Sequence, residues 1–188
     1  MRAALVLAVV VAAAVLAGCG PQGPGEAGGD AGDPAEIVRV LPSPGDLRGQ
    51  PGAEADAQQL ARAFTGRDDP ALAEVVEERA PSAAATRTWS DPQGGTLTVA
   101  ATVWPSHLVA TGVGSDLAAF LVADGGDAWT PAAVPSSRGA RRDDPREMRL
   151  GLSVGPNALY VRSTGDVDED VVIETMELMR LTLEGQTG

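Results

Sequence analysis

One motif in this sequence is of the kind that positions a nucleophilic serine. Gly151, Ser153 and Gly155 fit the pattern G-x-S-x-G, which in hydrolases lifts the serine above a sheet on a sharp strand-to-helix turn. Here the residues around Ser153 alternate as in a strand, and Gly155 leads into a Pro-Asn turn. His107, the only histidine, precedes the serine, whereas that class of hydrolase places its histidine last. We therefore assign no catalytic residue and keep a hydrolase using Ser153 as an alternative.

A second group of residues imitates a calcium-binding loop. Asp166, Asp168 and Asp170 are followed by Glu177, eleven residues after the first of them. The sixth position of such a loop needs glycine for its turn, but Val171 occupies it. An acidic helix N-terminus explains the same carboxylates, because the helix dipole favours negative charge there. The sequence therefore predicts no metal site, and leaves open whether these residues bind calcium.

Arginines gather in one stretch of an otherwise acidic chain. Residues 138–149 contain five arginines and three acidic residues, a local charge of +2. Guanidinium groups match the oxygens of carboxylates and phosphates. We therefore predict that Arg138, Arg141 and Arg142 contact an anion or a partner. The alternative is a solvated loop whose arginines pair with neighbouring acids.

The only cysteine, Cys19, ends a segment typical of export signals. Arg2 is followed by an unbroken apolar run over residues 3–17. As a helix this run spans about 22 Å, shorter than the hydrocarbon core of about 30 Å that a transmembrane helix must cross. Its length suits the apolar part of a signal peptide.

The end of this segment, Leu16-Ala17-Gly18-Cys19, resembles the lipobox of bacterial lipoprotein precursors of the actinobacterial type. The resemblance implies cleavage between Gly18 and Cys19, and diacylglycerol on the Cys19 thiol. Two acyl chains suffice for stable anchoring, so we expect the protein at the extracytoplasmic face of the cell membrane. The alternatives are a plain secretory signal with an incidental cysteine and a poor membrane anchor.

The sequence divides into three parts. Residues 1–18 form the signal peptide, and residues 19–35, with six glycines and three prolines, form a predicted disordered tether. Residues 36–188 form one predicted α+β domain. The predicted strands are residues 36–41, 86–90, 96–104, 148–154 and 158–162, and the predicted helices are residues 53–65, 70–79, a helix from 106 or 115, and 168–184.

These elements predict an antiparallel sheet of two β-hairpins with packed helices. The order is β-β-α, β-β-α after an N-terminal helical segment, and residues 124–145 read as loop. This order is similar to that of Mog1/PsbP-like small lipoprotein domains of actinobacterial envelopes. Trp89, Trp104, Trp129 and Tyr160 are predicted core residues.

Composition excludes several classes of function. One cysteine excludes an intrachain disulfide, and a net charge of −12 argues against nucleic-acid binding. Cleavage before Cys19 removes one arginine and no acid, which leaves −13. We therefore expect a non-catalytic, lipid-anchored envelope protein without a cofactor, whose domain binds an unknown envelope protein or small ligand. The alternatives are the tethered Ser153 hydrolase and a lipid or solute carrier with an apolar cavity above about 300 Å³.

Overall fold

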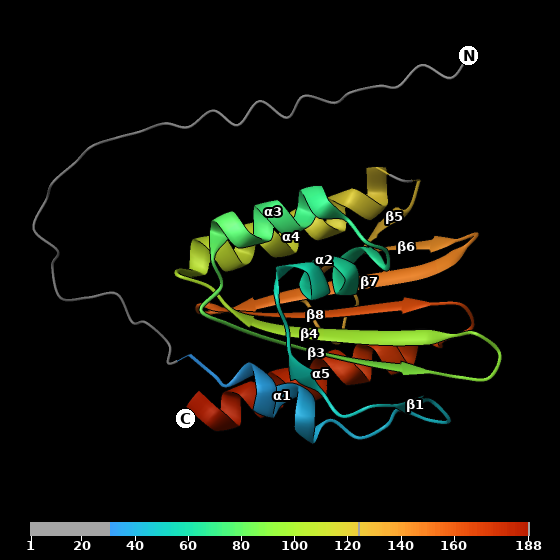
Figure 1. Ribbon diagram of the computed structural model, residues 1–188. Helices are drawn as coiled ribbons and strands as arrows, with labels where there is room; N and C mark the ends of the chain where they lie inside the picture. Colours follow the sequence, from blue (N-terminus) through green and yellow to red (C-terminus); the bar gives the residue numbers. More distant parts are fainter. Residues whose placement is uncertain (1–30, 124, 188) are drawn as a thin grey trace, which may run out of the picture.

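The computed structural model describes residues 31–123 and 125–187, which fold around one antiparallel sheet (Figure 1). The strands follow the spatial order β1-β3-β4-β8-β7-β6-β5, and β2 pairs with β3 outside this path. The predicted α+β class is confirmed. The strands are β1 (Arg48–Gly49), β2 (Ala53–Glu54), β3 (Ala83–Ser90), β4 (Thr96–Val103), β5 (Asp127–Trp129), β6 (Arg138–Asp143), β7 (Arg146–Val154) and β8 (Asn157–Thr164).

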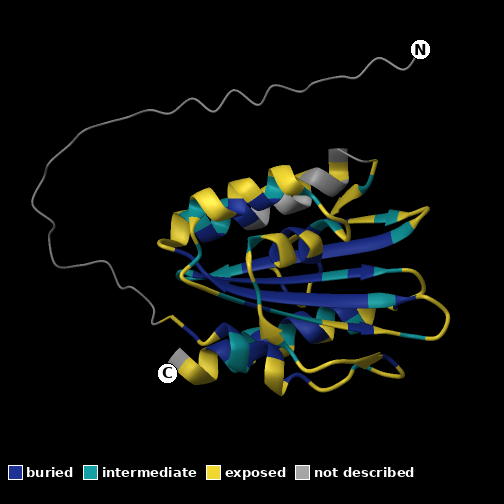
Figure 2. Cartoon of the chain, viewed as in Figure 1, coloured by how far each residue is buried: buried dark blue, intermediate teal, exposed yellow. Residues whose placement is uncertain are grey.

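Helices cover both faces of the sheet (Figure 1). On one face lie α1 (Pro34–Val40) and α5 (Glu169–Thr187), and on the other lie α2 (Ala57–Thr65), α3 (Pro70–Arg79) and α4 (His107–Ala123). Each face has its own apolar cluster, so the sheet separates two layers of core. The strands in the middle of the sheet are mostly buried, while the outer sides of the helices are exposed (Figure 2).

The two central hairpins form as predicted. Strands β3 and β4 pair along their whole length, with Trp89 opposite Leu97, and β7 pairs with β8 around the turn after Val154. Because side chains alternate along a strand, Met148 of β7 joins the core under α5, while its neighbour Glu147 points to the α2–α4 face.

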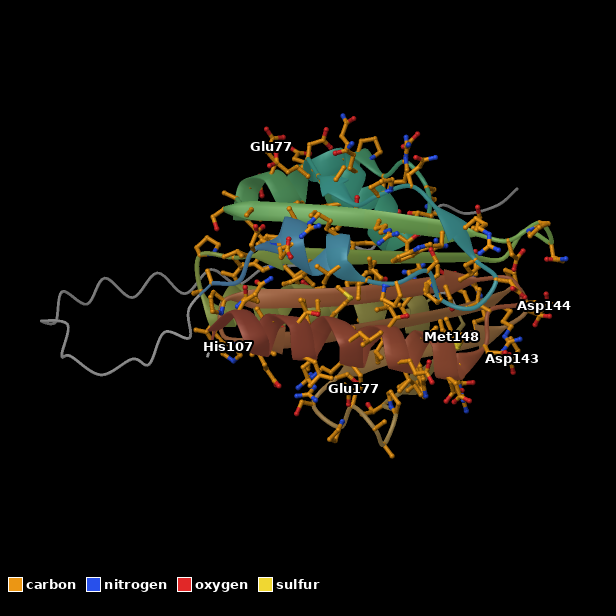
Figure 3. All side chains as sticks on the ribbon, turned by 90° about the horizontal axis from the view of Figure 1, so that it is seen from below. Glu77, His107, Asp143, Asp144, Met148 and Glu177 are labelled. Atoms are coloured by element: carbon orange, nitrogen blue, oxygen red, sulfur yellow. The ribbon has the colours of Figure 1, made fainter. Side chains whose placement is uncertain are left out.

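The last helix also follows its predicted pattern. Val172, Met176, Met179 and Leu183 lie on one side of α5 and are fully buried against the sheet. Figure 3 looks onto this helix from outside and shows Glu177 on its outward side. The apolar stripe read from the sequence is therefore the face that α5 buries.

The first element differs from its prediction. Residues 36–41 were expected to be a strand, but Pro34–Val40 form helix α1. The side chain of Asp33 accepts a hydrogen bond from the Ala35 N–H, and proline occupies the first turn, two signals that begin a helix. The Gly32 N–H donates to Asn157 Oδ1, 3.0 Å away. The packed part of the chain thus includes residues 32–35, which the sequence assigned to the tether.

Two further boundaries differ from the sequence analysis. The predicted loop 124–145 contains β5 and β6, which pair through their backbones. Their charged sequences lack the alternation of apolar and polar residues that indicates a strand. Helix α2 begins only at Ala57, because Asp56 and Gln59 form a capping box there and residues 53–54 are a strand. Of the two predicted starts of α4, the structure has the earlier one, since the helix begins at His107 and continues through Gly112.

Within residues 31–123 and 125–187, no helix is long and apolar enough to cross a membrane. Gly18 and Cys19, the predicted cleavage and lipidation residues, lie outside the described residues.

Candidate functional site

One buried carboxylate meets three guanidinium groups on the α2–α4 face of the sheet. Glu147 and Arg149 lie on β7, Arg162 on β8 and Arg142 on β6. The strand register brings them together, since Arg149 lies opposite Arg162 and Glu147 lies opposite Arg142. We call these four residues the arginine cluster.

The contacts of the cluster converge on the two oxygens of Glu147. Arg162 Nε donates to Oε1 over 2.7 Å, and Arg149 Nε donates to the same oxygen over 2.9 Å. Arg142 Nη2 donates to Oε2 over 3.0 Å. The Glu147 and Arg149 side chains are each 6% exposed, and Arg162 is 12% exposed. These pairs are therefore shielded from water and salt much more than surface ion pairs are.

Charge within the cluster is unbalanced. Three guanidinium groups face one carboxylate, so the cluster carries a net charge of +2. Burial alone would raise the pKa of Glu147, but the charges of Arg162 and Arg149 and their hydrogen bonds outweigh it and hold this pKa below its usual value. Glu147 is therefore ionised at neutral pH and compensates only part of the positive charge.

The C-terminus of α2 closes one side of the cluster. Gly66, the C-cap residue of α2, lies directly against the guanidinium of Arg162. Tyr160, which neighbours Arg162 on the same face of β8, donates its hydroxyl to the Phe64 carbonyl oxygen over 3.1 Å. The negative end of the helix dipole thus lies near Arg162 and favours its charge.

Several guanidinium nitrogens of the cluster have no partner from the protein. In the described part of the chain, Arg149 contacts Glu147 through Nε and Nη2, and its Nη1 makes no hydrogen bond. Arg162 bonds through Nε alone, which leaves both of its Nη atoms without an acceptor there. Donors in this state can bind oxygens of a further anion.

The cluster contains one of the three arginines that the sequence singled out. Arg142 belongs to it, whereas Arg138 is exposed at the start of β6. Arg141 points to the other face of the sheet and donates to Glu169 over 3.0 Å. Sequence reasoning counted Arg149 among the five arginines of residues 138–149 without naming it as a contact residue, and it missed Arg162. The signal for them was the second hairpin, whose register places the two arginines opposite each other.

Ser153 does not lie on the turn that a hydrolase of the G-x-S-x-G class needs. It belongs to β7, which continues through a tight turn into β8. His107 Nδ1 lies 2.9 Å from the Gly155 carbonyl oxygen, and its Nε2 lies 3.4 Å from Thr111 Oγ1. No hydrogen bond joins Ser153 to His107 within the described residues. In Figure 3, His107 lies at the opposite end of the sheet from Asp143 and Asp144, where the arginine cluster begins.

The acidic group at the start of α5 does not form a calcium loop. Asp166 pairs with Arg146 over 2.7 Å, and Asp170 already lies in the first turn of α5, which begins at Glu169. Among the residues that the structure describes, no three His, Cys, Asp or Glu side chains are grouped so that they could hold a metal ion.

A small cavity lies between the sheet, α2 and α4. Its walls include Phe64, Thr102, Val113 and Tyr160, and its volume is about 10 Å³. That volume holds about one water molecule. This cavity therefore does not provide the apolar space that a lipid carrier requires.

The chain matches no protein-family model and no curated protein. Among solved structures it is similar to the crystal structure of the extracellular domain of PknH from Mycobacterium tuberculosis. The TM-score is 0.51 at 9% sequence identity, over 80% of this chain and 90% of that domain. At this identity the likeness defines a shared fold: an antiparallel sheet with helices packed on it.

Proposed function

We propose that this chain is a non-catalytic, lipid-anchored protein of the extracytoplasmic envelope, and that its domain binds an envelope partner or a small ligand. Its location is supported by the sequence from Leu16 to Cys19, where the only cysteine occupies the lipidation position. The fold shared with an extracellular domain is consistent with this location.

The observation that carries the binding role is the arginine cluster. The guanidinium groups of Arg149 and Arg162, whose side chains are 6% and 12% exposed, share one carboxylate oxygen of Glu147, and nitrogens of both remain without acceptors in the described part of the chain. A cluster built only for stability would be expected to balance its charges, because an unpaired buried charge is costly.

Lipid anchoring is tested with Cys19→Ala in the full-length chain. We expect this variant to leave the membrane fraction and to lose labelling with radioactive palmitate, because the thiol that carries the lipid is gone. Gly18→Ala is the matched control, since alanine keeps a small residue before the cysteine and should preserve both. Unchanged membrane association and processing of the Cys19→Ala protein would disprove the anchoring.

The binding role is tested by native mass spectrometry of the full-length chain purified from its own envelope in a non-ionic detergent. We expect a partner or small ligand to remain bound. A protein that carries only its lipid, under conditions that preserve non-covalent complexes, would contradict the binding role.

A further inference from the structure

We infer that the arginine cluster binds the carboxylate or phosphate group of a small solute. This inference rests on the proposed function, in which the domain binds a ligand outside the cytoplasm, and it names the chemical class of that ligand. The residues concerned are Arg142, Glu147, Arg149 and Arg162.

The charges of the cluster favour a second anion. Glu147 supplies one negative charge to three guanidinium groups, and the Arg149 side chain is only 6% exposed. Among the described residues, the buried side-chain polar atoms without a partner are Trp89 Nε1 and Trp104 Nε1, so the unpartnered Nη atoms of Arg149 and Arg162 are open to solvent and to an entering anion. The same surplus excludes a cationic ligand at this position.

The geometry offers hydrogen-bond donors from two neighbouring strands. Arg149 and Arg162 lie opposite each other in the β7–β8 ladder, and both bond Oε1 of Glu147. Nη1 of Arg149 and both Nη atoms of Arg162 make no hydrogen bond in the described part of the chain, and those of Arg162 lie against Gly66. Donors arranged in this way match an oxyanion, which offers several acceptor lone pairs at short spacing.

Strand β4, which pairs with β8, adds threonine side chains beside the cluster. Thr98 lies opposite Arg162 on β4, and its hydroxyl shares a hydrogen bond of 3.1 Å with Thr88. Thr96 and Thr164 share another, of 2.6 Å. Hydroxyls can donate as well as accept, so these threonines are compatible with a polar anionic ligand and not with an alkyl chain.

The position of the cluster favours a solute over a lipid headgroup. The tether joins the domain at Gly32, which is bonded to Asn157 beside the β7–β8 turn. Glu147 lies at the other end of β7, about 23 Å away at about 3.3 Å per residue. The cluster thus lies at the end of the sheet remote from the attachment to the membrane.

The test is calorimetric titration of the full-length lipidated chain, in a non-ionic detergent, with inorganic phosphate and separately with acetate. Ionic strength is held constant with chloride, so that general screening does not change. We expect saturable binding of one anion per chain. Arg149→Met should weaken it at least tenfold, whereas Arg138→Met, at an exposed arginine of β6, should leave it unchanged.

A second variant keeps the test decisive if Arg149→Met does not fold. Glu147→Gln removes the only carboxylate of the cluster and keeps its shape, so we expect it to bind phosphate at least threefold more tightly than the original chain. Failure of both the original chain and Glu147→Gln to bind either anion would overturn the inference. Equal affinities of Arg149→Met and Arg138→Met would also overturn it.

Vesicles distinguish the source of the anion. Phosphatidylglycerol and phosphatidylcholine vesicles should bind the Cys19→Ala chain equally weakly. A preference for phosphatidylglycerol that Arg149→Met abolishes would overturn the assignment to a solute.

The outcomes also separate this inference from the proposed function. A lipidated, ligand-carrying chain that binds neither phosphate nor acetate disproves only the oxyanion, whereas an unlipidated chain that binds phosphate disproves only the anchoring.

Discussion

Gly66 and Arg162 lie in direct contact, although 96 residues separate them in the sequence. Gly66 ends α2 in the left-handed conformation, with φ of 75°. A Cβ at this position would overlap the Arg162 guanidinium. The absence of a side chain therefore serves both the helix end and the placement of an arginine of the cluster.

Gly66→Ala should lower the free energy of unfolding by about 2–3 kcal/mol. About 1–2 kcal/mol comes from the left-handed conformation, and the remainder comes from displacing Arg162. Gly94→Ala is the matched control, because Gly94 has φ of 93° and open space around it. Urea denaturation measures both. An equal loss in the two variants would show that Arg162 moves aside without cost.

Glu147→Gln should destabilise the chain by about 3 kcal/mol at neutral pH, because it breaks a buried network of ion pairs. The pKa of Glu147 is lowered in the folded chain. Its stabilising effect is therefore complete above the unfolded value of 4.5 and is lost as the pH falls through the folded value. Urea denaturation from pH 7 down to pH 3 should show the two proteins converging. A constant difference would contradict the assignment.

Much of the fold was readable from local patterns. The helix at Pro70–Arg79 has its aspartate cap and proline, and α5 has a regular apolar stripe. Strands β5 and β6 were not readable, because their charged residues do not alternate with apolar ones. They form because β7 offers β6 an edge to pair with and β6 in turn offers one to β5, which is a tertiary effect.

The site was only partly readable for a related reason. The run of arginines drew attention to residues 138–149, but neighbours along a strand point to opposite faces. Arg141 therefore pairs with Glu169 under the sheet, while Arg142 joins the cluster. Arg162 stands outside the run, and its role depends on the register of the hairpin. Sequence alternation predicts a hairpin, but a shift of one residue in register would have separated Arg149 from Arg162.

Met176→Ala should destabilise the chain by about 2–5 kcal/mol, because it opens a cavity between α5 and the sheet. Met176 is fully buried in the core. Leu181→Ala, on the same helix at 54% exposure, should change the stability by less than about 0.5 kcal/mol. Thermal unfolding compares the two. Similar losses would mean that α5 does not pack in the orientation described.

Tyr160→Phe should lower the stability by about 1 kcal/mol at neutral pH, because the Phe64 carbonyl loses its buried hydrogen-bond donor. Burial raises the pKa of Tyr160 above its ordinary value of 10. Above pH 10 the unfolded chain gains stability by ionising this phenol and the folded chain does not, so the original protein should lose its advantage over Tyr160→Phe as the pH rises. Tyr160 is the only tyrosine, so phenolate absorbance reports on it alone. Ionisation near pH 10 in the folded chain would contradict its burial.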